Sequence, residues 1–108
     1  MTDWARAADM LDTVANLLDG MPDMDPDGAI RIALAGHPHA QIPDDHTEVS
    51  TLYDDVARAI EADHARMFLG RDSDSLYISE IPIAEVIPAA RAAVERFRNY
   101  AQRQEGRP

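Results

Sequence analysis

The side chains best suited to holding a metal ion gather in one short stretch of the sequence. His37 and His39 flank a proline, and the run Asp44-Asp45-His46 follows a few residues later. Imidazole and carboxylate groups are ligands for zinc or nickel, and a single loop could bring them together. The spacing matches no established metal motif, so the simpler interpretation is a solvated polar loop. His64 stands apart, near the expected end of a helix, where a charged imidazole suits the helix dipole.

A second candidate for cation binding is the aspartate-rich stretch that precedes Gly28. Asp23, Asp25 and Asp27 occupy alternate positions before this glycine. Residues 23–30 resemble the first eight positions of an EF-hand calcium loop, in which alternating oxygens turn inward and the glycine permits a sharp bend. The resemblance implies a calcium ion held by these three carboxylates.

The same stretch departs from the EF-hand pattern in two ways. The twelfth position is Leu34, where EF-hands carry a bidentate glutamate, and Pro26 lies inside the loop. An aspartate followed by proline is a common helix start, with Asp25 as the cap and Pro26 as the first helical residue. The sequence therefore leaves a cation loop and a simple helix start as alternatives.

Signatures of catalysis are missing from the sequence. Cysteine is absent, which excludes thiolate nucleophiles, disulfides and cysteine-ligated metal sites. The serines have no Gly-x-Ser-x-Gly context, and the 5 glycines are scattered and form no phosphate-binding loop. We therefore expect a protein that is not an enzyme and that uses no cofactor, with a small enzyme of unknown chemistry as an alternative.

Acidic residues dominate the charge of the chain. The 20 Asp and Glu residues outnumber 10 basic residues, all of them arginine, and the net charge is −10. A surface of this sign repels phosphates, so direct binding of DNA or RNA is not expected. Two interpretations stay open: a partner with a basic surface, or a codon bias towards Ala, Arg and Asp without functional meaning. The balance is reversed after residue 90, where arginines outnumber glutamates.

Carboxylates on two expected helices are the candidate partner-binding residues. One row lies on the polar face of the first helix, and further carboxylates add negative charge on the third. Their members are Asp9, Asp12, Asp19, Asp54, Asp55 and Glu61. We expect a small interaction protein that binds and regulates or inhibits a protein with a basic surface. One alternative is a phage or mobile-element inhibitor whose carboxylates mimic the phosphates of a nucleic acid; calcium or metal binding is another.

The last expected helix offers a different surface. Arginines surround Phe97 and Tyr100 there, and arginine and aromatic residues are enriched at protein interfaces. This pattern indicates a possible homodimer through the C-terminal helix. The alternative is that Phe97 belongs to the core and that the arginines form local pairs, such as Arg91 with Glu95.

Periodicity and caps predict the first two helices. Apolar residues recur every three or four positions from Trp4, with Asp3 or Thr2 as the cap and Gly20 at the end. A shorter helix follows between the Asp25 cap and Gly36. It is apolar nearly all round, so we expect it to be buried.

Later elements are predicted from capping and composition. An Asp45–Glu48 capping box starts a third helix that extends to His64. Residues 66–70 and 76–81 are short apolar runs around a polar linker, which predicts a β-hairpin. The final helix should begin at or near Pro88, and residues 104–108 should fray.

The predicted fold is therefore a single α+β domain over residues 1–108, mainly helical, in the order α-α-α-β-β-α. No apolar run approaches the roughly 20 residues that a membrane span needs, and the N-terminus lacks the apolar stretch of a signal peptide. A cytoplasmic protein is the resulting expectation.

Overall fold

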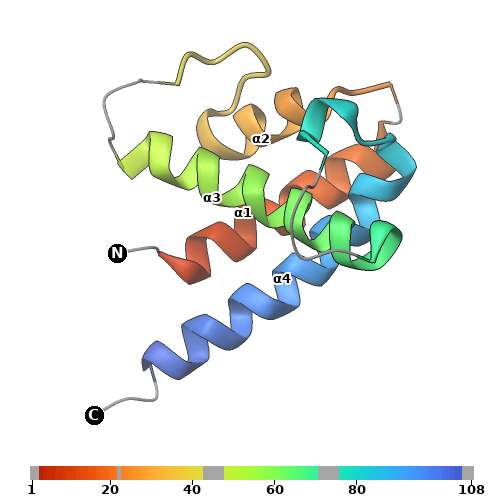
Figure 1. Cartoon of the computed structure of the whole chain (residues 1–108). Helices are drawn as coiled ribbons and strands as arrows, with labels where there is room; N and C mark the ends of the chain where they lie inside the picture. The colour runs from red at the N-terminus through yellow and green to blue at the C-terminus, as the bar shows by residue number, and fades with distance from the viewer. Residues whose placement is uncertain (1–2, 22, 43–47, 71–75, 106–108) are drawn as a thin grey trace.

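Four α-helices make up most of the chain. The computed structural model describes residues 3–21, 23–42, 48–70 and 76–105. The helices are α1 (Trp4–Gly20), α2 (Pro26–Ala35), α3 (Glu48–His64) and α4 (Ile83–Glu105). Two short turns complete the fold: a π-helical turn, η1 (Ala65–Leu69), and a 3₁₀ turn, η2 (Ile78–Glu80) (Figure 1).

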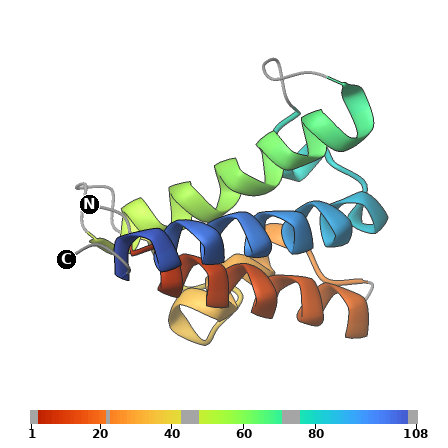
Figure 2. The same ribbon diagram turned by 90° about the horizontal axis from the view of Figure 1, so that it is seen from below.

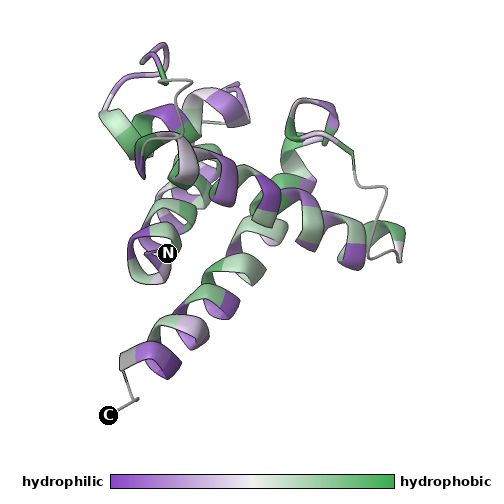
Figure 3. Ribbon diagram, turned by 60° about the vertical axis from the view of Figure 1, so that its left-hand side comes forward, coloured by the Kyte–Doolittle hydropathy of each residue, from purple (hydrophilic) through white to green (hydrophobic). Residues whose placement is uncertain are grey.

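Helix α4 packs along both α1 and α3 and runs antiparallel to α1 (Figure 2). Helix α2 contacts the same two helices from the opposite side, so that α1 and α3 lie between α2 and α4 (Figure 1). The turn η2 rests on α2 and α3. The final turns of α4 extend away from the other helices (Figure 3).

The core forms where the apolar stripes of α1 and α4 meet. Leu11, Val14 and Leu18 of α1 are fully buried, as are Val86 and several alanines of α4. The small alanines let the two helix backbones approach closely, and burial of each large aliphatic side chain stabilises the fold by about 1.5–3 kcal/mol. The Asp3 carboxylate caps α1 by accepting a hydrogen bond from the Arg6 N–H at 3.1 Å, as predicted.

Helix α2 has the predicted bounds. Asp25 caps it by accepting the Asp27 N–H at 3.2 Å, and Pro26 is the first helical residue. Gly36 ends the helix in the left-handed region, at φ +81°, which favours glycine. Burial is confined to the first half of this helix, so the expectation of a wholly buried helix was too strong.

The predicted β-hairpin is wrong, because the described part of the chain contains no strand. The first apolar run continues α3 as the π-helical turn η1, which ends at Gly70 with φ +64°. The second run forms the 3₁₀ turn η2, and Ile78 and Ile81 insert into the core. The polar linker, residues 71–75, lies outside the described residues.

A side chain on α3 replaces the hydrogen bonding that a partner strand would have supplied to the second run. The Glu61 carboxylate accepts the Ile78 N–H at 2.8 Å and ties η2 to α3. Strand propensity depends strongly on the surroundings of a segment, and here burial on a helical surface is the competing solution. The correct fold class is all-α.

The predicted start of the last helix is also wrong. Helix α4 begins at Ile83, and the N–H groups of Glu85 and Val86 both bond to the Pro82 carbonyl. Pro88 therefore lies inside the helix, where it lacks an N–H and leaves one helical hydrogen bond unmade. Complete burial of the flanking residues Val86, Ala89 and Ala90 offsets this cost.

The remaining predictions concern where α3 begins and where α4 ends, and they lie partly outside the described residues. Asp45, the expected cap of α3, lies outside them, and the described helix begins at Glu48, which the capping box places at the third helical position. Helix α4 includes residues 104 and 105, whereas residues 106–108 are not described. Among the described helices, none is long and apolar enough to cross a membrane.

Candidate acidic binding groove

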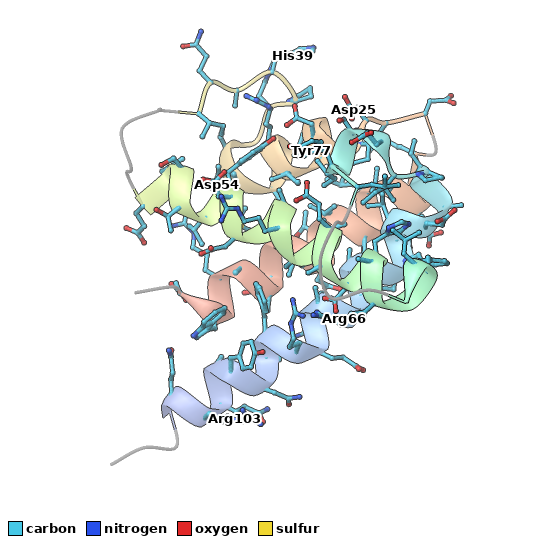
Figure 4. All side chains as sticks on the ribbon, in the orientation of Figure 1. Asp25, His39, Asp54, Arg66, Tyr77 and Arg103 are labelled. Carbon is cyan, nitrogen blue, oxygen red and sulfur yellow. The ribbon has the colours of Figure 1, made fainter. Side chains whose placement is uncertain are left out.

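A groove of about 540 Å³ opens between the start of α2, the middle of α3 and the turn η2. Four carboxylates and one guanidinium line it, together with two tyrosines. These residues are Asp25, Asp27, Tyr53, Asp54, Arg58, Glu61 and Tyr77. Figure 4 shows Asp25, Asp54 and Tyr77 on the same side of the molecule. The groove therefore carries a surplus of negative charge.

Asp27 anchors one wall of the groove through a cluster that joins α2 to α3. Its carboxylate accepts hydrogen bonds from the Tyr53 hydroxyl and, at 2.9 Å, from Arg31 Nε. The Arg31 guanidinium lies over the Tyr53 ring, 5.5 Å from its centroid, and also donates to the Ala40 carbonyl. Asp27 is therefore held in place by two donors and is less available to a ligand than the other carboxylates.

The same cluster changes the acidity of Tyr53. Burial, with the Asp27 carboxylate as a second cause, raises the pKa of Tyr53 to about 12. The bond to Asp27 also raises the pKa of Arg31. Tyr53 therefore remains a protonated donor, and Arg31 a cation, at any physiological pH.

The turn η2 forms the opposite wall and is positioned by Glu61. Because one Glu61 oxygen accepts the Ile78 N–H, the neighbouring Tyr77 is held at the rim of the groove. The Tyr77 side chain is 73% exposed, the most exposed large apolar side chain in the described part of the chain. An exposed aromatic ring beside carboxylates can pack on the apolar part of a cation and attract its charge.

Asp54 and Asp25 are the carboxylates most open to a ligand. Asp54 is exposed and forms none of the ion pairs found among the described residues. Asp25 is exposed as well, and only its Oδ1 is engaged, as the cap of α2. Arg58 is the one cation in the lining and partly offsets their charge.

The carboxylate row on α1 is interleaved with arginines of α4. Asp19 Oδ2 lies 3.4 Å from Arg91 Nη2, and Asp12 Oδ2 lies 4.0 Å from Arg98 Nη2. Asp9 is exposed and has no such pair among the described residues. The acidic exterior is therefore interrupted by arginines along α1, whereas carboxylates outnumber cations four to one in the lining of the groove.

The candidate residues on α3 separate onto two sides of the helix. Asp54 and Glu61, seven positions apart, both line the groove. Asp55 instead lines a hollow beside Trp4, on the side of α3 that faces α4. Asp55 therefore lies apart from Asp54 and Glu61, and its role in partner binding stays a prediction.

No cation loop is assembled at the start of α2. Among the described residues, no three His, Asp or Glu side chains are grouped as a metal site would require. Asp25 and Asp27 are engaged by the helix cap and by Tyr53 and Arg31, and Asp23 is exposed. The arrangement is the helix start that the sequence offers as the alternative.

The three described histidines lie in two separate places. The rings of His37 and His39 lie 5.7 Å apart on the loop after α2, and the His37 Nδ1 accepts the His39 N–H at 3.0 Å. His46 lies outside the described residues. His64 is fully buried at the end of α3, where its Nε2 lies 2.8 Å from Glu85 Oε1 of α4.

The C-terminal helix uses Phe97 as a core residue. Phe97 is buried and meets the Trp4 ring edge to face, with ring centroids 5.0 Å apart. Tyr100 is only half-buried and also meets the Trp4 ring, with ring centroids 4.9 Å apart. Arg91 pairs with Asp19 of α1 and not with Glu95. A homodimer through this helix would therefore meet Trp4 and Tyr100, while Phe97 lies beneath them.

The sequence does not identify the two tyrosines and Asp25 as groove residues. Its patterns favour the core face of α3 for Tyr53, a strand for Tyr77, and a cap or cation loop for Asp25. These positions are far apart in sequence, and no local periodicity brings them together. The alternation of apolar and polar residues could have marked Tyr77 as exposed, but not its neighbours.

No protein family model, curated protein sequence or solved structure matches this chain. The function must therefore be inferred from the groove and from the distribution of charge.

Proposed function

We propose that the chain binds a protein partner through its acidic groove and that the partner inserts a basic segment there. The observation that carries the proposal is the lining of the groove, in which four carboxylates face one guanidinium. An arginine or lysine side chain would pair with Asp54 and Asp25 and pack its stem on the exposed Tyr77 ring.

The groove is a better candidate for this role than the α1 row. Asp12 and Asp19 already have arginine neighbours from α4, so a partner would have to displace them. The same two ion pairs weigh against a nucleic-acid mimic, which needs an unbroken series of carboxylates. In the groove Asp27 is already paired with Arg31, but Asp25 and Asp54 form none of the ion pairs among the described residues, and Arg58 is the one cation in the lining.

The proposal is tested with a blocked oligoarginine peptide as the probe. Asp25→Asn and Asp54→Asn together remove two charges from the groove, and asparagine retains the helix cap at position 25. We expect the double variant to bind the probe about tenfold more weakly, since each exposed charge pair contributes up to about 1 kcal/mol. Isothermal titration calorimetry at low salt measures the affinities.

The matched control removes two charges from α1 through Asp9→Asn and Asp19→Asn. Both double variants have the same net charge, so a general field effect would weaken binding equally in the two proteins. If the α1 variant loses more affinity than the groove variant, the partner-binding face lies on α1 and the proposal is wrong. Binding that is unchanged between roughly 0.05 and 0.5 M salt would also contradict it, because a contact between charges is screened.

A further inference from the structure

Two adjoining hollows lie where α1 begins and α4 ends, and the first of them borders the acidic groove at Arg58 of α3. They have volumes of about 280 Å³ and 390 Å³ and share Trp4 and Tyr100 in their linings. Arg58 and Arg96 line the first hollow, and Arg103 lines the second. We call the two together the aromatic hollow. Figure 4 shows Arg103 on the part of α4 that extends beyond the other helices.

The floor of this hollow is a fixed cluster of aromatic rings. Trp4 meets Phe97 and Tyr100 edge to face, with centroid distances of 5.0 Å and 4.9 Å. Phe97 is buried, whereas Trp4 and Tyr100 are only half-buried. Rigid, amphipathic rings of this kind offer contact area at low entropic cost and dominate many protein interfaces.

Two of the arginines that flank these rings take part in none of the ion pairs found among the described residues. Arg58 and Arg103 form none of those pairs, whereas the other described arginines pair with Asp or Glu. Arg96 lies 5.4 Å from the Phe97 ring centroid and turns its terminal nitrogens to Asp63. Asp55 is the one carboxylate in the lining. In a strongly acidic protein, this surface is locally basic.

We propose that the aromatic hollow docks an acidic peptide segment of a partner protein, one that carries an aromatic side chain between carboxylates. The ring would stack on Trp4 and Tyr100, and the flanking carboxylates would pair with Arg58 on one side and Arg103 on the other. The charge of the lining selects this occupant, because a neutral or basic segment would leave both guanidinium groups without a counter-charge from the ligand.

The overall negative charge of the chain does not prevent this contact. At an ionic strength of 0.15 M the Debye length is about 8 Å, so distant carboxylates are screened while guanidinium groups in direct contact are not. A single-stranded nucleic acid could also stack on these rings. Its charge at every nucleotide would, however, bring additional phosphates close to the acidic surface, so a short acidic peptide fits better.

Trp4 is the only tryptophan in the chain and therefore reports directly on the hollow. The probe is a blocked peptide in which two glutamates flank a phenylalanine, and the matched peptide has glutamines in place of the glutamates. At about 0.15 M salt we expect the acidic peptide to change Trp4 fluorescence saturably and to bind at least fivefold more tightly than the glutamine peptide.

Variants assign the contact to the two arginines. Arg58→Gln and Arg103→Gln should each weaken the acidic peptide by about threefold. Arg91→Gln makes the same charge change on the exposed surface of α4, beside Asp19, and should leave the affinity unaltered. Far-UV circular dichroism checks that all three variants keep the helical fold.

Arg58 also separates this proposal from the acidic groove, since it lines both sites. Arg58→Gln should weaken the acidic peptide in the hollow and strengthen the oligoarginine probe in the groove. If Arg58→Gln strengthens the oligoarginine probe but does not weaken the acidic peptide, the proposal for the groove stands and the proposal for the aromatic hollow is wrong.

Three results would overturn the docking of an acidic segment. One is equal affinity for the acidic and glutamine peptides. Another is tighter binding of a short oligothymidylate, which would make the hollow a nucleic-acid surface. The third is a Trp4 signal that depends on protein concentration without peptide, together with a dimer mass by sedimentation, which would make a second copy the occupant.

Discussion

Tyr53 is held in the wall of the groove with its hydroxyl bonded to Asp27, and this contact fixes the distance between α2 and α3. Asp63, one turn beyond the groove on α3, has a comparable role towards α4, because it faces Arg66 at 2.7 Å and Arg96 at 3.2 Å. Both side chains are titratable groups whose pKa is raised, and both therefore make the stability of the fold depend on pH.

Tyr53→Phe should remove the highest tyrosine transition. The pKa of Tyr53 is about 12 in the folded chain, against 10.0 for an unperturbed phenol. The folded state thus holds the proton more tightly, and its contribution to stability is complete below about pH 10 and is lost as pH rises to about 12. In a titration followed by tyrosinate absorbance, one of the 3 tyrosines should therefore titrate near pH 12.

The control for this titration is Tyr77→Phe, which removes an exposed ring. It should leave the transition near pH 12 intact. Loss of the highest transition in Tyr77→Phe, or its survival in Tyr53→Phe, would show that this transition does not belong to Tyr53.

Asp63→Asn should change how the free energy of unfolding depends on pH. Burial raises the pKa of Asp63 above 3.8, and the charge of Arg66 opposes this effect. Because the folded state keeps this proton longer than the unfolded state, the free energy of unfolding falls as pH rises through that pKa. The wild-type advantage over Asp63→Asn should therefore shrink as the pH rises above 3.8, as measured by urea denaturation. An advantage that grows over this range would mean that the two arginines outweigh burial.

At the scale of elements, the sequence predicts three helices well and one segment badly. All three carry apolar stripes, and α1 and α2 also carry their own caps or stops in Asp3, Asp25 and Gly36, so local chemistry suffices. The segment from Ala65 to Pro82 has strand-forming residues but takes its shape from Glu61 and from core positions for Ile78 and Ile81. Those contacts come from other elements, and no local pattern contains them.

The groove is predictable only in part, for the same reason. Asp54 and Glu61 share a face of one helix, and their spacing shows it. Asp25 and Tyr77 join them only because α2 and η2 pack against α3. At Pro88 the local signal is strong but misleading. It predicts a helix start there, whereas burial of the neighbouring residues lets the helix begin earlier, at Ile83.

Pro88→Ala should stabilise the chain. Alanine restores the N–H that can bond within α4 and has the highest helix propensity, and we expect a gain of about 1–3 kcal/mol. The measurement is the melting temperature by circular dichroism. Pro82→Ala, just before the helix, is the control and should be neutral or lower the stability by up to about 1 kcal/mol. A lower melting temperature for Pro88→Ala would indicate that the proline ring itself is needed for packing.

At the scale of the whole molecule, charge is distributed by face. Negative charge concentrates on the groove, the α1 row is interleaved with arginines, and the end of α4 is locally basic. The ion pairs along α1 join half-exposed side chains, and such pairs contribute at most about 1 kcal/mol each. Repulsion among the remaining carboxylates is therefore the larger electrostatic effect on stability.

Added salt should consequently raise the melting temperature. Screening between roughly 0.02 and 0.3 M NaCl weakens the repulsion that follows from a net charge of −10 more than it weakens the few exposed pairs. Differential scanning fluorimetry measures the effect. The Asp25→Asn, Asp54→Asn double variant has less repulsion to screen and should respond less. A melting temperature that falls with salt would mean that the ion pairs outweigh the repulsion.

Arg58 of α3 lines both the groove and the aromatic hollow. Its single guanidinium cannot interact equally with ligands in both sites. An anion that captures it on the hollow side cancels the one positive charge that opposes cations on the groove side. Each ligand would then make room for the other, and thermodynamic reciprocity requires the two enhancements to be equal. An anionic ligand in the aromatic hollow and a cationic ligand in the groove would in this way strengthen each other's binding through Arg58.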